Sequence, residues 1–418
     1  MKKQLTVALG LAVLATPVFA SKARLQALGE DSYGSAYIND NRNIWLNAAQ
    51  INNHKDLVTY EFGGNTNQDS AANARGEGGV YKAHGNFVYG VHFGGASNTA
   101  NGLRAAAGLL EVDVTDVASF QGTGDEENNI DLFIGGDAGM KWGANLGYAR
   151  TQGEEGGGEY GESLRTRLGV IMGDTQVYAN INLINNAKGD FLAENGGGAG
   201  VDLTGSSKFE GKLGYQVGAI HAWEGNTLFA DFRSFDMESS IVATGYDAKE
   251  DLASKQLEVG IGRVERLNDK TNLFAKASFF MRNLENDHGK SAGLFGAAGA
   301  CDFGIANAFC ESYDSQRVPV VVGVETEATS WLTLRASVSQ TIWGTQEIDT
   351  SAEKIESGFR NTTAINAGAT LKFGELSVDG VIGNNDGTAA SIGEDTSSGR
   401  GTLRTDNLMT RVAMTYRF

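Results

Sequence analysis

From residue 57 to the end of the chain, apolar and polar residues alternate with a period of two. In the last segment, residues 405–418, one face is apolar and the other carries arginines: Val412, Met414, Tyr416 and Phe418 against Arg411 and Arg417. Side chains alternate across a β-strand, so this pattern predicts strands with two unlike faces.

Sixteen segments follow this pattern. Short connections rich in Gly, Asn and Asp join them in pairs, because tight hairpin turns need positive φ. Eight longer connections lie between the pairs. The predicted strands are 57–63, 79–84, 86–95, 129–142, 144–152, 162–173, 175–187, 207–223, 226–238, 254–267, 271–283, 316–328, 331–345, 360–373, 375–384 and 405–418.

The short-long rhythm and the even strand count predict an all-β transmembrane antiparallel β-barrel of about 16 strands, with short periplasmic turns and long extracellular loops. A bilayer core offers no water to unpaired backbone groups, so only helices or closed barrels span it. The alternative is a soluble secreted sandwich or solenoid, in which the apolar faces form the core. The strand lengths and the rhythm of the connections favour the barrel.

Residues 1–20 have the features of a secretory signal peptide. Lys2 and Lys3 precede an apolar stretch, and small residues Val18 and Ala20 suit cleavage after residue 20. We therefore expect three parts: a signal peptide at 1–20, an N-terminal periplasmic or lumen-inserted segment at 21–56, and the barrel at 57–418.

The composition agrees with an exported β protein. Hydrophobic residues make up 41%, and 57 Gly stand against only 2 Pro, which disfavours disorder and helical bundles. The formal net charge of −17 argues against a nucleic-acid partner.

The final residues, Leu408 to Phe418, resemble the C-terminal strand of Gram-negative outer-membrane porins. In that family the terminal Phe and the alternating apolar residues signal to the barrel assembly machinery. The resemblance implies that role here for Phe418, Tyr416, Met414 and Val412. It also implies a cell outer membrane location, contact with outer-membrane lipid and lipopolysaccharide, and a homotrimer.

The segment from Ser21 to Phe62 is similar to the N-terminal block of porin-like major outer-membrane proteins of predatory Gram-negative bacteria. It carries two marked runs, 23–29 and 40–49. The second run also resembles the Asn-Pro-Ala element of hydrophobe-transporting barrels, with Ala48 in place of the proline. Its apolar residues, among them Leu25 and Trp45, favour insertion into the lumen over a frayed terminus.

Charged residues at inward positions predict the chemistry of the channel. A barrel of this size is wide enough for an aqueous pore, and charges on its wall select solutes by field and bore. Candidate pore-lining residues on the wall are Arg165, Arg167, Arg335 and Arg411. Alternatively, the inward charges pair with one another across a narrow or plugged lumen.

The connection 96–128 combines an apolar helix-like piece with acidic residues. An apolar patch on an outer loop needs burial, so we expect it to fold inward or to contact another subunit. In the first case Glu111, Asp113 and Asp116 face Arg165 and Arg167 across a constriction.

Cys301 and Cys310 lie in one Gly/Ala-rich loop. In an oxidising compartment they predict a disulfide, with a two-Cys metal site as the weaker alternative because no His lies at ligand spacing. No metal site is expected elsewhere.

These features together predict a porin: a passive, water-filled channel for small hydrophilic solutes and ions, without a cofactor. An enzyme is not expected, since no nucleophile elbow or P-loop occurs. Two alternatives are a structural or surface-interaction barrel with a plugged lumen, and a hydrophobe transporter of the FadL-like type.

Overall fold

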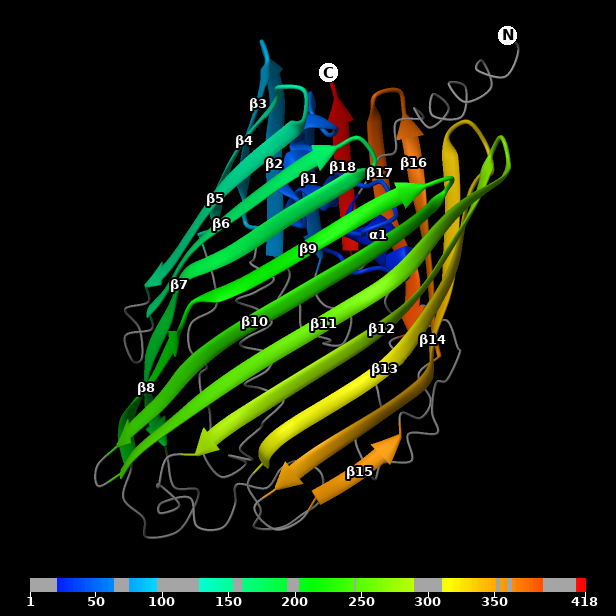
Figure 1. Ribbon diagram of the computed structural model, residues 1–418. Coiled ribbons are helices and arrows are strands. Elements are labelled where there is room, and N and C mark those ends of the chain that lie inside the picture. Colours follow the sequence, from blue (N-terminus) through cyan, green and yellow to red (C-terminus); the bar gives the residue numbers. More distant parts are fainter. Residues whose placement is uncertain are drawn as a thin grey trace.

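The strands of the chain form one closed antiparallel barrel. The computed structural model describes residues 21–63, 75–95, 128–152, 160–193, 203–243, 246–288, 310–350, 354–358, 363–385 and 411–418. β1 (Leu57–Gly63) pairs with β2 (Arg75–His84) on one side and with β18 (Arg411–Arg417) on the other, so the last strand closes on the first (Figure 1).

The remaining strands follow one another around the wall. Their bounds are β3 Phe87–Phe93, β4 Ile130–Asp137, β5 Lys141–Gln152, β6 Tyr160–Met172, β7 Thr175–Ala193, β8 Leu203–Gly211, β9 Gly214–Trp223, β10 Asn226–Ala243, β11 Tyr246–Asn268, β12 Thr271–His288, β13 Cys310–Glu327, β14 Leu332–Thr350, β15 Lys354–Gly358, β16 Ala364–Phe373 and β17 Leu376–Asn385. Hairpin turns gather at one end of the barrel, which we call the turn end. The opposite end, with the long connections, is the loop end.

The predicted barrel of sixteen strands is confirmed. Within the described ranges, the 18 strands of the sheet make sixteen crossing segments. β8 and β9 both pair with β7 and β10, so they are two parts of one crossing segment. In the same way β15 and β16 both pair with β14.

Strand bounds differ from prediction in two respects. Several strands continue further toward the loop end, and β11 reaches 23 residues. The turn between β4 and β5 lies at residues 138–140 rather than at Gly143. There the Ala138 amide donates to the Met140 carbonyl at 3.1 Å, and Gly139 takes a positive φ of 85°. Gly143 belongs to β5, where any side chain would overlap the Ala48 carbonyl oxygen.

The two faces of the wall have opposite chemistry. Large apolar side chains point outward and are exposed, among them Val58, Tyr60, Leu132, Leu146, Val217, Ile261, Val322 and Val338. Charged and polar side chains point inward and are buried, among them Glu61, Glu77, Asp131, Arg165, Asp231, Arg335 and Asp379. A soluble sandwich or solenoid requires the reverse, so that alternative is excluded.

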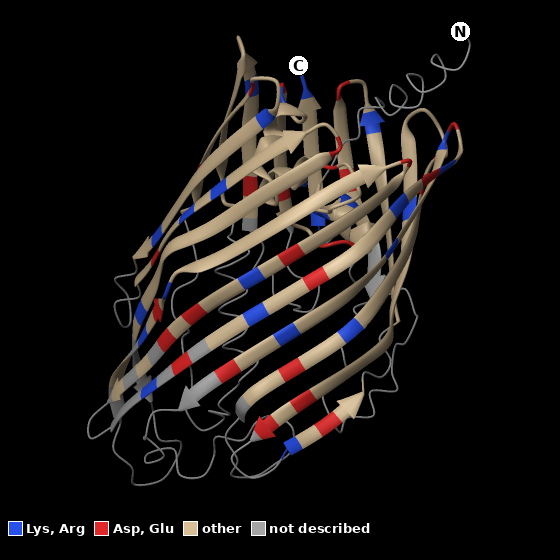
Figure 2. Cartoon of the chain, in the orientation of Figure 1, with Lys and Arg blue, Asp and Glu red and all other residues tan. Residues whose placement is uncertain are grey.

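Charged residues on β10–β15 gather toward the loop end (Figure 2).

In the part of the chain that the structure describes, no helix is long and apolar enough to cross a membrane.

Residues 21–56 lie inside the barrel near the turn end, and we call this segment the plug (Figure 1). It contains α1 (Lys22–Ala27) and two 3-10 helices, η1 (Asn41–Trp45) and η2 (Ala48–Asn52). Each helix begins after a residue whose side chain accepts a hydrogen bond from a backbone N–H of the first turn, as N-caps do: Ser21, Asp40 and Asn47. The local sequence therefore starts three short helices in this segment.

Candidate functional site: the plugged lumen

Two apolar clusters join the plug to the wall. Ile44, Trp45 and Ile51 pack against wall residues Leu57, Tyr81, Val88 and Phe133. On the other side, Leu25, Leu28, Tyr37 and Ile38 pack against Phe274 of β12. Inward wall positions that would line an aqueous pore are therefore partly a dry interface.

Glycines on the inner wall make room for the plug. A Cβ at Gly169 of β6 would lie 1.8 Å from Oδ1 of Asn47, and one at Gly262 of β11 would lie 2.3 Å from Cγ of Tyr37. At Gly143 of β5 it would lie 2.2 Å from the Ala48 carbonyl oxygen. Real Cβ atoms cannot occupy such positions, so the wall is shaped to this segment.

The first ionic cluster holds the start of the plug against β1 and β2. Lys22 Nζ lies 2.7 Å from Glu77 Oε2, and Arg42 Nη1 lies 2.6 Å from Glu77 Oε1. The backbone N–H of Lys22 donates to Glu61 at 2.9 Å. Arg42, Glu61 and Glu77 are buried and Lys22 is half-buried, so two cations and two carboxylates lie together.

The second ionic cluster joins the plug to β13, β14 and β17. Arg24 contacts Asp40 within the plug and Glu325 on β13, both at 2.9 Å. Arg335 of β14 contacts the same Glu325 and also Asp379 of β17, both at 3.0 Å. Arg335 therefore lies in a chain of alternating charges that runs from Asp40 to Asp379.

The predicted pore residues Arg165 and Arg167 lie together on the inner face of β6. Both contact Asp131 of β4, at 2.9 and 3.3 Å. Arg167 also lies over the ring of Trp45 at 4.9 Å, with Arg42 at 5.1 Å from the same ring. A cation over an indole is favourable, so Trp45 links plug and wall.

Other predicted site residues are placed as follows. Arg411 is half-buried on β18, opposite Gly63 of β1. Glu111, Asp113, Asp116 and Cys301 lie outside the described residues, and only the backbone of Cys310 is described, at the start of β13.

The proposed assembly signal lies at the seam between the first and last strands. Met414, Tyr416 and Phe418 are exposed outward, while Val412 is buried. The backbone N–H of Phe418 donates to the Asp56 carbonyl at 3.1 Å, and Lys82 Nζ lies 4.6 Å from the Phe418 ring.

Two cavities lie on opposite sides of the plug. One of about 430 Å³ opens on its loop side, between Gly29, Asp31 and the inner faces of β10–β14. Another of about 480 Å³ opens on its turn side, between Tyr37–Asn39 and the turns of β9–β14. Lys276 is bound to Glu30 at 2.8 Å between them, and the Tyr37 hydroxyl donates to Glu30 at 3.3 Å. A partition of plug residues therefore lies between the two cavities.

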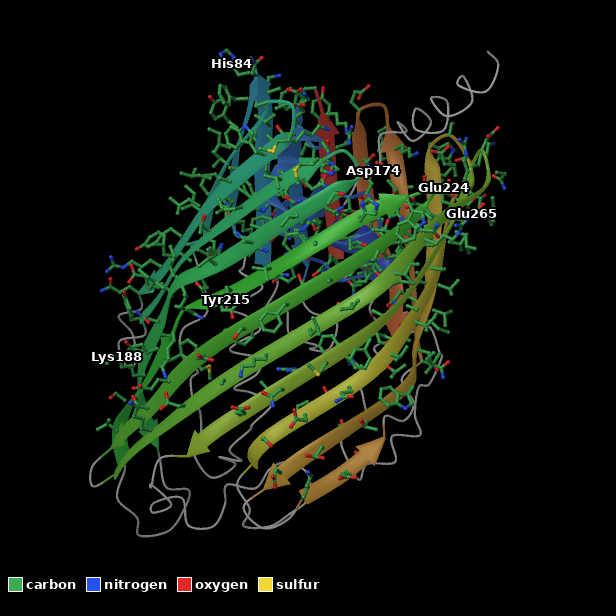
Figure 3. The ribbon with its side chains drawn as sticks, in the orientation of Figure 1. His84, Asp174, Lys188, Tyr215, Glu224 and Glu265 are labelled. Carbon is green, nitrogen blue, oxygen red and sulfur yellow. The ribbon has the colours of Figure 1, made fainter. Side chains whose placement is uncertain are left out.

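Acidic residues mark the mouth at the turn end. Asp174 and Glu224 line the turn-side cavity. Figure 3 shows both near the turn end, together with Glu265 and, across the barrel, His84. Lys188, by contrast, lies toward the loop end of β7.

His54 is a buried titratable group where the plug meets β1. Within the described residues, neither ring nitrogen has a hydrogen-bond partner. Burial, with a smaller effect from the nearby Arg417, lowers the pKa of His54 to about 3. The ring is therefore neutral at physiological pH.

The outer surface settles the class of protein. The closed sheet leaves no free edge between β1 and β18, and its exposed apolar face carries aromatic residues beside the turns: Trp223, Trp331, Phe373 and Phe418. Such a band with an aromatic girdle is typical of outer-membrane barrels. The chain is an outer-membrane β-barrel.

Comparison with solved structures gives matches at low sequence identity. A Pseudomonas aeruginosa FadL homologue is 12% identical, with a TM-score of 0.41, and the match covers 96% of this chain and 98% of that one. The Ralstonia pickettii toluene transporter TbuX is 12% identical, with a TM-score of 0.39 and the same coverage. OmpT, an outer membrane protein of Vibrio cholerae, is 10% identical, with a TM-score of 0.33, over 87% of this chain and 97% of that one.

The chain matches no protein-family model and no curated relative. At these identities and TM-scores, the likenesses give no information on substrate or mechanism.

Two acidic partners of the plug are absent from the sequence-based prediction. Glu61 and Glu77 were not singled out, although Glu61 stands between two outward aromatic residues, Tyr60 and Phe62, at an inward position. A carboxylate there was a usable signal for an interior ion pair.

Proposed function

We propose that this protein is a gated channel of the outer membrane for small hydrophilic solutes, with the plug as its gate. The barrel provides the route through the bilayer, and residues 21–56 close it between passages. The turn end would face the periplasm, as short turns do in bacterial barrels.

One observation carries this proposal: two cavities face each other across a partition of plug residues. The partition is held by the Glu30–Lys276 ion pair and by the packing of Leu28 and Ile38 on Phe274. Movement of this small segment would join the cavities without opening the wall.

The charged wall supports a hydrophilic cargo. The loop-side cavity is lined by Asp31, Asp231, Arg233, Glu258 and Arg317. Such a lining favours polar solutes over hydrocarbon, because an apolar solute would desolvate these charges without pairing them.

Planar-bilayer recording tests the gate. The wild-type channel is expected to be mostly closed, and Arg24→Gln combined with Arg42→Gln should raise the open probability and the permeation of small neutral sugars. Arg263→Gln, on the outer face of β11, is the matched control and should behave as wild type. A steady conductance that is the same in wild type and in the double variant would refute the plug as a gate.

A second candidate is a hydrophobe transporter. The turn-side cavity favours it, since Tyr37, Ile38, Val264 and Phe274 give that cavity an apolar side. Liposome uptake of a small apolar fluorophore, compared with a sugar of similar size, separates the two. Faster uptake of the fluorophore would support this candidate.

A further inference from the structure

The outer face of the wall has a hollow of about 750 Å³ between β5 and β11, toward the turn end. Two neighbouring rows of outward apolar side chains form it, on strands that lie side by side (Figure 1). The row nearer the turns includes Val177, Ala219 and Ala230, which pair in that order. The next row includes Leu168, Ala179 and Phe232.

Alanines form the floor of the hollow. Ala219 of β9 pairs with Ala230 of β10, and Ala179 of β7 lies diagonally to Ala219 in the next row. The larger Leu168 and Phe232 stand on either side of them. Contact with lipid requires only that these positions be apolar, so membrane exposure alone does not call for a depression here.

The hollow lies at the depth of the acyl chains. Trp223 is one of the exposed aromatic residues beside the turns, and such residues mark the membrane interface. Ala219 precedes Trp223 in β9, and the distance between them is about 13 Å along the strand. With strands tilted by about 40°, the floor is about 10 Å deeper in the bilayer than the girdle.

A hydrogen-bond donor lies between the hollow and the girdle. His221 is exposed on the outer face of β9, one outward position beyond Ala219. Its Nδ1 lies 2.9 Å from the Thr175 hydroxyl, and its ring stacks on Trp223 at 6.1 Å between centroids. When Thr175 donates to Nδ1, the neutral ring carries its hydrogen on Nε2, which can donate to an anion.

Packing decides what fills a hollow in this position. The hydrophobic effect does not favour filling it, because lipid tails are as apolar as the wall. Dispersion does, because a chain lying in the hollow contacts protein on several sides, whereas a chain against a flat wall contacts it on one. The hollow is continuous with the apolar band that faces the bilayer, so acyl chains are the molecules that reach it.

We propose that the hollow binds one acyl chain of a phospholipid from the leaflet at the turn end. The chain lies over Ala179, Ala219 and Ala230, and the phosphate accepts a hydrogen bond from Nε2 of His221. The site is on the outer face of the wall and goes beyond the proposed channel function, since it does not depend on whether the plug opens.

Native mass spectrometry of the full-length barrel tests the site, after detergent exchange has removed bound lipid and dioleoylphosphatidylethanolamine has been added. Ala219→Leu combined with Ala230→Leu fills the floor and should lower the amount of retained lipid about tenfold relative to wild type. Ala277→Leu, on the outward face of β12 and outside the hollow, is the matched control and should retain lipid as wild type does. Heat-modifiable migration shows that each variant is folded.

Dioleoylglycerol has the same chains without the phosphate and tests the headgroup contact. Wild type should retain it about tenfold less than the phospholipid, since the hydrogen bond to His221 is lost. His221→Phe keeps an aromatic ring without the donor and should retain the two lipids equally. A His221→Phe variant that still prefers the phospholipid would refute the headgroup contact.

Equal retention of the phospholipid by wild type and by the Ala219→Leu, Ala230→Leu variant would overturn the proposal. A dimer or trimer that is present in the wild-type spectra and lost only in this variant would also overturn it, because the hollow would then hold a second copy of the chain.

Discussion

Arg24 of the plug donates two hydrogen bonds to Glu325 of the wall, from Nε at 2.9 Å and from Nη2 at 3.0 Å. This paired geometry is the strongest arrangement of a guanidinium and a carboxylate. The two residues are 301 positions apart in sequence. The contact therefore joins the first segment of the chain to a strand near its other end.

Arg24→Gln is expected to destabilise the seated plug by about 3–5 kcal/mol, the usual cost of removing one partner of a buried ion pair. Asp40 and Glu325 would be left without their common cation. Hydrogen exchange of residues 22–28 measures the effect, and their amides should exchange faster than in wild type. Arg266→Gln, which breaks an exposed pair at a turn, is the control and should change nothing.

Gly169→Val is expected to displace η2, because any Cβ at this position overlaps Asn47. Overpacking of this kind costs about 1–3 kcal/mol. Exchange of the amides of residues 47–52 should rise about tenfold or more. Ala179→Val, on the outward face of β7, adds similar volume and should leave those amides protected. Unchanged protection in Gly169→Val would show that the wall yields instead of the plug.

His54 is expected to make the stability of the barrel depend on pH. Its pKa is about 3 in the folded protein and about 6.5 in an unfolded chain, so the unfolded state binds more protons between these values. The free energy of unfolding should therefore be highest above pH 6.5 and fall toward pH 3, by about 1.4 kcal/mol per pH unit from this group.

Denaturant titrations of wild type and His54→Gln between pH 7 and pH 4 isolate this contribution. The difference in slope between them is the contribution of His54. His84→Gln, at an exposed position near a turn, should keep the wild-type slope. Parallel curves for wild type and His54→Gln would contradict a buried neutral imidazole.

Phe418→Ala is expected to lower the amount of folded barrel in the membrane several-fold. The exposed ring follows β18 on the outer face and lies against Lys82 of β2. Heat-modifiable migration of membrane fractions measures folded barrel. Phe373→Ala, another exposed aromatic residue beside a turn, is the control. An equal loss in both variants would assign the effect to the aromatic girdle instead of to a terminal signal.

Much of the wall could be predicted from the sequence because lipid imposes a strict alternation. Val58, Tyr60 and Phe62 face outward while Thr59 and Glu61 face inward, as a period of two requires. The parts of the strands near the loop end were harder to predict. Exposed pairs such as Lys249–Glu238 show that β10 and β11 continue where both faces are polar. The sequence there has no apolar face from which a strand could be predicted.

The ionic contacts of the plug could not be predicted from local sequence. Arg42 and Glu77 meet only because the barrel closes around η1, and no period or motif relates them. Inward glycines such as Gly262 were visible, but a glycine in a strand does not show what approaches it. Their partners follow from the three-dimensional fold alone.

The seam between β1 and β18 makes the wall depend on its final residues. Seven residues of β1 pair with β18, so a prematurely terminated polypeptide would expose a row of bare amides and carbonyls to hydrocarbon. Such a product could not mature. Completion of synthesis is thereby checked by the same hydrogen bonds that finish the cylinder.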